Sequence, residues 1–168
     1  MTIMKGANVW RMPDREAGIA GLHQRIPFLL SQLGIYLAED FVHRLEPFGV
    51  EPRAYAVMKA LSEDDGRSQR ELSTQLGIHR NVMVTVVDKL EREGLVKRMP
   101  HPADRRAFAV TLTDKARELL PKLDAEGRTQ EDEITALLTD DERKAVLQHL
   151  QRMSTAAGLI PGVHPKLG

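Results

Sequence analysis

The stretch Ser68–Leu112, SQRELSTQLGIHRNVMVTVVDKLEREGLVKRMPHPADRRAFAVTL, holds the pattern that decides the fold. It opens with Ser68-Gln69-Arg70-Glu71, a capping box in which a hydroxyl and a carboxylate each reach a free backbone N–H. Leu72 and Leu76 follow, and Gly77 stops the helix. The pattern predicts a short helix that ends in a tight turn.

A second helix is predicted over residues 79–93, with Gly94 as its C-terminal stop. Beyond it, residues 95–99 and the alternating residues 108–112 predict two antiparallel strands joined by a charged loop. The order helix, turn, helix, β-hairpin is that of a winged helix-turn-helix.

Helical patterns flank this unit on both sides. Apolar residues spaced three or four apart predict a long amphipathic helix from Gly21 to Glu46, and Pro52 begins a shorter one. Downstream, Thr113 caps a further helix and Thr139 to Glu142 form a second capping box. The predicted fold class is mainly α, with a small β-hairpin wing and a helical dimerisation region.

The domain organisation follows from these patterns. Residues 1–20, with Trp10, form an N-terminal arm that could extend a dimer contact or cover a pocket. The helical dimerisation region is assigned to 21–50 and 114–158, the winged helix-turn-helix to 51–113, and a flexible tail to 159–168.

The helix over 79–93 has two unlike faces. A stripe at helical spacing is predicted to be buried; its members are Met83, Val86, Val87 and Leu90. The opposite face mixes amide, small apolar and basic groups, which can pair with base edges in a major groove wide enough for one helix. The predicted base-reading residues are Arg80, Asn81, Val84 and Thr85.

Further contacts are predicted around this face. The start of the preceding helix presents backbone N–H groups to the phosphate backbone. The predicted phosphate contacts are Gln69, Arg70, Lys89 and Arg92, and Ser68 is also predicted to contact DNA. In the loop between the strands, Asp104 could hold an arginine in an inserting pose, and Arg105 and Arg106 suit the negative potential of a minor groove. Taken singly, each feature is also compatible with an ordinary solvated surface.

Three segments of the chain resemble the MarR family of bacterial transcriptional regulators. They are Ser68–Ile78, Val87–Val96 and the wing Pro102–Ala107 followed by Leu112-Thr113. The likeness covers roughly residues 25–155. It implies a homodimer that binds a pseudo-palindromic operator on double-stranded DNA, usually represses, and releases DNA when a small aromatic or phenolic ligand binds between its dimerisation and DNA-reading parts.

The chain departs from the family pattern at His79, Asn81 and Thr85, where the family commonly has Asp or Ser, Ser, and Arg or another polar residue. The operator sequence is therefore not transferable from relatives. The first helix also lacks the cysteine of the oxidation-sensing members.

The dimer is also expected on physical grounds, because the flanking helices have broader apolar faces than one small winged domain can cover. A two-fold pair would present its two copies of the helix over residues 79–93, called the recognition helix below, about 34 Å apart, at successive major grooves. The alternative is a compact monomeric bundle. Tyr36, His43 and Tyr55 are candidates to line a ligand pocket, although the tyrosines could be core residues and His43 could be solvated.

Composition excludes several function classes. The chain has 24 basic and 24 acidic side chains, but residues 67–106 carry nine basic and five acidic ones, a net charge of +4. The absence of cysteine excludes disulfides, thiolate metal sites and cysteine nucleophiles, and it favours a cytoplasmic protein. No apolar run is long enough for a signal peptide or a membrane span.

No catalytic residue, cofactor or metal site is predicted. The six histidines have no pair at metal-ligand spacing, so a zinc site would require tertiary convergence. Asp64-Asp65 and Asp140-Asp141 are helix-end or turn carboxylates rather than an acid and base pair. Two other functions stay open: a winged-helix protein-interaction module without sequence-specific DNA binding, and a small enzyme.

Overall fold

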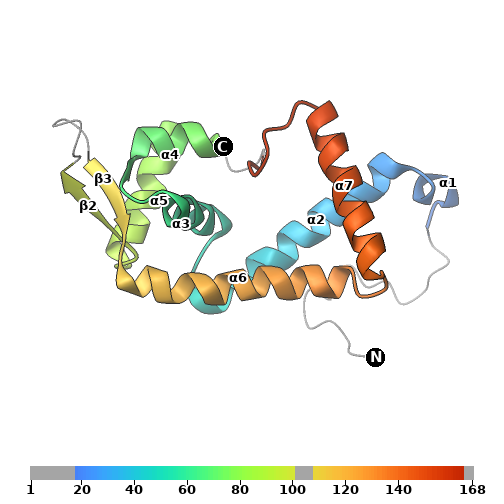
Figure 1. The fold of residues 1–168 in the computed structure, drawn as a ribbon, viewed down its shortest axis with the longest axis horizontal. Coiled ribbons are helices and arrows are strands. Elements are labelled where there is room, and N and C mark those ends of the chain that lie inside the picture. The colour runs from blue at the N-terminus through green and yellow to red at the C-terminus, as the bar shows by residue number, and fades with distance from the viewer. Residues whose placement is uncertain (1–17, 101–107, 165–168) are drawn as a thin grey trace.

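A computed structural model describes residues 18–100 and 108–164 (Figure 1). Its elements, in chain order, are α1 (Ala20–His23), α2 (Ile26–Leu45), the 3-10 turn η2 (Glu46–Phe48), α3 (Pro52–Glu63), β1 (Arg67–Ser68), α4 (Gln69–Leu76), α5 (Arg80–Arg92), β2 (Val96–Pro100), β3 (Phe108–Leu112), α6 (Asp114–Ile134) and α7 (Asp140–Ala156). The predicted fold class, mainly α with a small β wing, is confirmed.

The molecule is elongated, with two ends joined by helices (Figure 1). One end holds α3, α4, α5 and the sheet, and the other holds α7, α1 and the start of α2. Helix α6 runs from the sheet to α7 and packs against α2 and α3 on the way. Helix α6 thus connects the winged unit, which is formed by α3, α4, α5 and the sheet, to the outer helices.

The helix-turn-helix forms as its capping residues predict. Ser68 Oγ accepts from the backbone N–H of Glu71 at 3.3 Å, and the Glu71 carboxylate accepts from the N–H of Ser68 at 2.7 Å. Gly77 ends α4 in the left-handed region, at φ +63°, where a side chain would be strained. The capping box at Thr139 and Glu142 is confirmed in the same way at the start of α7.

The wing contains the predicted hairpin and one strand more. Strands β2 and β3 pair antiparallel, with Val96 opposite Leu112 and Pro100 opposite Phe108. The additional strand, β1, pairs with β3 and gives the sheet order β1-β3-β2. A two-residue strand has no alternating pattern of its own, so the sequence could not reveal it.

The prediction of one long helix from Gly21 to Glu46 is wrong in one respect, because the helix is interrupted at Gln24 and Arg25. Pro27 lies in the first turn of α2. In a continuous helix its ring would clash with the carbonyl of His23, four residues earlier, so the chain breaks and restarts where the missing N–H is tolerated.

The core joins α3, α4 and α5 to the sheet, the end of α2 and the first half of α6. Its fully buried large side chains include Leu45, Met58, Leu61, Leu72, Met83, Leu90, Val110 and Leu123. Three members of the predicted α5 stripe, Met83, Val87 and Leu90, are completely buried. Val86 is half-buried and packs against the edge of this cluster.

Large apolar side chains remain exposed at the other end of the molecule. On α2 and around its start they are Ile19, Leu22, Ile26, Phe28, Leu30, Leu33 and Ile35, and around α7 they are Ile134, Leu137, Val146, Leu147, Leu150 and Met153. None of the helices in 18–100 and 108–164 is both long and apolar enough to cross a lipid bilayer.

Candidate nucleic-acid interface and ligand cavity

The first half of α5 presents the four predicted base-reading residues. Arg80, Asn81, Val84 and Thr85 are all exposed; Asn81, Val84 and Thr85 lie on the side of the helix away from its buried stripe, and Arg80 is the first residue of the helix. The Thr85 hydroxyl donates to the carbonyl of Asn81 at 3.2 Å, and this bond fixes its rotamer. His79 caps the helix, with Nδ1 accepting from the N–H of Asn81 at 3.3 Å.

The three predicted DNA contacts at the start of α4 differ in exposure and in hydrogen bonding. Arg70 is exposed. The Ser68 hydroxyl donates to the Glu71 carboxylate at 2.8 Å as part of the capping box. The amide nitrogen of Gln69 is buried without a hydrogen-bond partner, so this side chain would have to turn outward to meet a phosphate.

The two basic residues near the end of α5 differ in their surroundings. Lys89 donates to Glu51 Oε1 at 2.6 Å, and this bond raises the pKa of Lys89. Arg92 is exposed, and its Nε donates to the carbonyl of Asp88 at 3.3 Å. Lys89 is therefore paired with a carboxylate of another element, whereas Arg92 lies along its own helix.

Arg98 on β2 connects the wing to the recognition helix. Its guanidinium donates to both Asp88 and Glu91 of α5. Burial alone would lower the pKa of Arg98, but the two carboxylates raise it. Sequence reasoning missed this contact, although Asp88 and Glu91, three residues apart on one helix face, are a spacing that suits a shared cation.

The wing residues Asp104, Arg105 and Arg106 lie outside the described residues. The strands on either side of that loop are described up to the pair Pro100 and Phe108.

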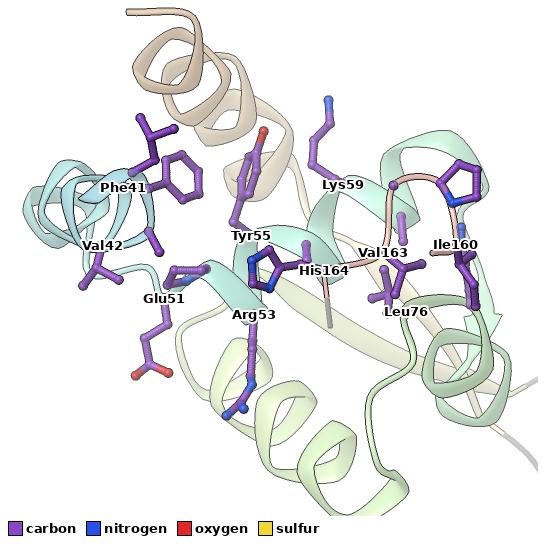
Figure 2. A pocket seen from close by; sticks show the side chains of 18 of the residues that line it. Phe41, Val42, Glu51, Arg53, Tyr55, Lys59, Leu76, Ile160, Val163 and His164 are labelled. Atoms are coloured by element: carbon purple, nitrogen blue, oxygen red, sulfur yellow. The ribbon is translucent and has the colours of Figure 1, made fainter. Parts of the chain in front are cut away.

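A cavity of about 1060 Å³ lies between α2, α3 and α4 (Figure 2). The segment 160–164, after α7, forms another wall. Its apolar lining includes Leu37, Phe41, Val42, Ala56, Leu76, Ile160 and Val163, and its polar lining includes Glu51, Arg53, Lys59, Glu63, Gln75, Gln130 and His164. An apolar interior with a few polar groups is typical of a small-molecule site.

Tyr55 is the one of the three predicted ligand-pocket residues that lines this cavity. Its ring packs edge-on against Phe41, with ring centres 5.6 Å apart. Its hydroxyl donates to Asp124 Oδ1 on α6 at 2.7 Å. Burial raises the pKa of Tyr55 well above its ordinary value, and the bond to Asp124 adds to the rise.

The other two candidates, Tyr36 and His43, do not line the cavity. Tyr36 is half-buried on α2. His43 is exposed, and its Nδ1 lies 3.3 Å from Glu46 Oε1, one turn further along the chain. Successive residues of a helix point in different directions, so Tyr36 and His43 are not part of the cavity lining although their sequence neighbours Leu37 and Val42 line it.

The sequence predicted a flexible tail over 159–168 and gave no sign that residues 160–164 would line the cavity. Gly158 and Gly162 adopt the left-handed conformation and turn the chain back toward α4. A Cβ placed on Gly77 would lie 3.4 Å from Cγ1 of Val163. The segment therefore reaches the turn of the helix-turn-helix, a contact that its sequence of small and turn-forming residues does not indicate.

A polar network around the buried Asp40 joins α2 to α6, and its member Gln130 also lines the cavity. Asp40 on α2 is 2% exposed and accepts from Arg44 Nε at 2.6 Å and from Gln130 Nε2 at 2.9 Å. Arg44 also donates to Glu133 Oε2 at 2.5 Å. The network fixes α2 to α6 because each buried charge has a partner.

No group of three or more metal-ligating side chains is gathered within residues 18–100 and 108–164. The carboxylates of Glu51, Asp88 and Glu91 are each engaged in an ion pair.

Comparison with known proteins gives consistent results. The sequence model of the MarR family matches residues 50–108. A proposed transcriptional regulatory protein for the hcr operon of Thauera aromatica is 30% identical over 133 residues, which cover 74% of this chain and 80% of that protein.

Two solved structures of the repressor CouR are similar in fold. The one bound to a 23-mer DNA duplex is 34% identical with a TM-score of 0.72, covering 83% of this chain and 99% of that one. CouR from Rhodococcus jostii RHA1 bound to p-coumaroyl-CoA is 28% identical with a TM-score of 0.68, covering 83% of this chain and 96% of that one.

Proposed function

This chain belongs to the MarR family of transcriptional regulators, and on that premise we propose that it is a homodimeric, ligand-responsive repressor of a pseudo-palindromic operator. The observation that carries the proposal is the exposed face of α5, whose amide, hydroxyl, methyl and guanidinium groups lie opposite the buried side chains of Met83, Val87 and Leu90. Such a face suits the donor and acceptor pattern of a major groove.

The assigned DNA contacts follow from where the side chains lie. Arg80, Asn81, Val84 and Thr85 read bases, and the exposed Arg70 and Arg92 hold phosphates. Ser68, Gln69 and Lys89 join them after local rearrangement, since each is engaged or buried in this structure. Arg105 and Arg106 of the wing probe the minor groove, and Asp104 holds an arginine in an inserting pose. CouR, which is similar in fold, was solved bound to a 23-mer DNA duplex, and this supports duplex DNA as the partner.

The exposed apolar residues of α2 and α7 are the proposed dimer interface. They lie at the end of the molecule away from α5, so pairing there leaves both recognition helices outside the interface (Figure 1). A contiguous apolar surface of this kind is rarely left uncovered in a monomer. A two-fold pair would place the recognition helices about one turn of DNA apart, roughly 34 Å.

The cavity is the proposed effector site. It touches α2 of the proposed dimer region and both α3 and α4 of the winged unit, so an occupant contacts both regions. A ligand shifts the equilibrium only if it prefers one arrangement of these regions over the other. An effector with an aromatic part fits the apolar walls, and p-coumaroyl-CoA, which CouR binds, is the first compound to test.

The proposal also includes two further statements: the chain has no catalytic activity, and it acts on DNA in the cytoplasm. The family relationship to transcriptional regulators supports both statements.

The test is a selection of bound duplexes from a random pool, repeated with p-coumaroyl-CoA and with a set of aromatic acids. We expect an enriched site with two-fold symmetry and binding that weakens steeply as salt rises, through counterion release. Failure to enrich any duplex at low salt would overturn the proposal and favour a winged-helix module that binds protein.

A further inference from the structure

Glu51 does not make the hydrogen bonds that are usual for a carboxylate at the start of a helix. It is the residue before α3, where a side chain ordinarily accepts from the helix's own free N–H groups. In this structure it makes no capping bond, and Pro52 holds its backbone extended, at φ −90° and ψ 154°. The side chain instead crosses to α5, where Oε1 accepts from Lys89 Nζ at 2.6 Å.

Lys89 is a proposed phosphate contact, so two anions compete for one ammonium group. The Lys89 side chain is 34% exposed and that of Glu51 is 66% exposed, which leaves both able to separate at a small cost. An ammonium that leaves a carboxylate for a phosphate gains one partner and loses another. The net gain in DNA affinity from Lys89 is therefore smaller than that from an unpaired lysine.

We propose that Glu51 is an internal competitor of the DNA phosphate: by holding Lys89 it lowers the affinity of the recognition helix for its operator. The proposal rests on the proposed function, in which Lys89 meets a phosphate. Glu51 is also one of the residues that line the cavity (Figure 2).

The pairing has a specific consequence for salt dependence. In the wild type, Lys89 exchanges a carboxylate for a phosphate, and the cation released from DNA is offset by one attracted to the bare Glu51. In the variant Glu51→Gln the amide attracts no cation, so the slope of log affinity against log salt steepens by up to about 0.9.

The experiment uses the full-length protein and the duplex enriched by the wild type. Binding is titrated at several salt concentrations for Glu51→Gln, for Lys89→Gln and for the double variant. Glu63→Gln is the matched control, because it removes the same charge from the other end of α3 and also lines the cavity. Thermal unfolding checks that all four variants fold.

We expect Glu51→Gln to bind at least about threefold more tightly than Glu63→Gln at low salt, and this advantage to vanish when Lys89 is Gln. Equal affinity of Glu51→Gln and Glu63→Gln would overturn the proposal, as would weaker binding or an advantage that survives in the Lys89→Gln background. If the wild type enriches no duplex at all, the proposed function fails, which is a distinct result.

Discussion

The hydroxyl of Tyr55 donates to Asp124 Oδ1 at 2.7 Å and thereby links α3 of the winged unit to α6. Lys59, one turn after Tyr55, donates to the other carboxylate oxygen at 3.1 Å. Asp124 is thus held by two donors from the same helix. Burial would raise the pKa of Asp124, but the bonds from Tyr55 and Lys59 lower it below its ordinary value.

Tyr55→Phe should destabilise the fold by about 1 kcal/mol at pH 7, since a hydrogen bond to a partly exposed charged group is lost while the ring and its packing on Phe41 remain. Urea unfolding measures the change. In the Asp124→Asn background the same substitution should cost less, and equal costs in both backgrounds would show that the bond contributes nothing.

The stability that Asp124 contributes to the fold should depend on pH. Its pKa is lower in the folded chain than in the unfolded chain. The contribution is therefore fully present above the unfolded value, about pH 4, and is lost as the pH falls through the folded value. Urea unfolding of the wild type and Asp124→Asn should differ most at neutral pH and converge as the pH falls below about 4. A constant difference across this range would contradict the assignment.

Arg98→Ala should loosen the wing from the recognition helix. Two carboxylates of α5, Asp88 and Glu91, would lose their shared cation, at a cost of about 1 to 2 kcal/mol in unfolding free energy because Arg98 is only partly exposed. Operator affinity should fall as well, although Arg98 is not a proposed DNA contact. Lys97→Ala, at the exposed neighbouring position, is the control. Identical unfolding curves for the two variants would show that Arg98 has no bracing role.

Asn81→Ala should cost about 1 to 3 kcal/mol of operator binding and relax specificity at one base position. The exposed amide lies in the first turn of α5, where base-edge contacts of a recognition helix are concentrated. Competition with duplexes substituted one position at a time measures the effect. A uniform loss over all sequences would reassign Asn81 to the phosphate backbone.

Arg106→Ala should weaken operator binding without changing the fold, because a wing arginine is proposed to enter the minor groove. Binding titrations and circular dichroism of the variant measure the two effects separately. Unchanged operator affinity would remove Arg106 from the interface.

Leu147→Glu should convert the dimer to monomers and lower operator affinity by at least tenfold. Leu147 is 54% exposed on α7, and a charge buried in an apolar interface has no partner. Analytical ultracentrifugation measures the mass. Gln148→Glu places the same charge on the adjacent exposed position and should remain dimeric if that side chain lies at the interface rim. A wild-type monomer would contradict the assigned interface.

Local signals determined most of the winged unit from sequence. The capping box at Ser68, Gly77 and the apolar stripe around Met83 predict their helices because caps, left-handed stops and 3.6-residue periodicity act within one or two turns. The same locality explains the errors. The periodic pattern of α2 continued across Gln24 and hid the effect of Pro27, and β1 was too short to have a pattern.

In the candidate site, too, the features set within one helix could be predicted from the sequence, and the contacts between elements could not. The sequence by itself determined which face of α5 is polar and which is buried, because helical geometry alone fixes that relation. Only the tertiary structure decided that Glu51 reaches Lys89, that Arg98 joins Asp88, and that residues 160–164 wall a cavity beside Gly77. These contacts join residues of different elements, and their existence depends on how those elements pack rather than on any pattern within one of them.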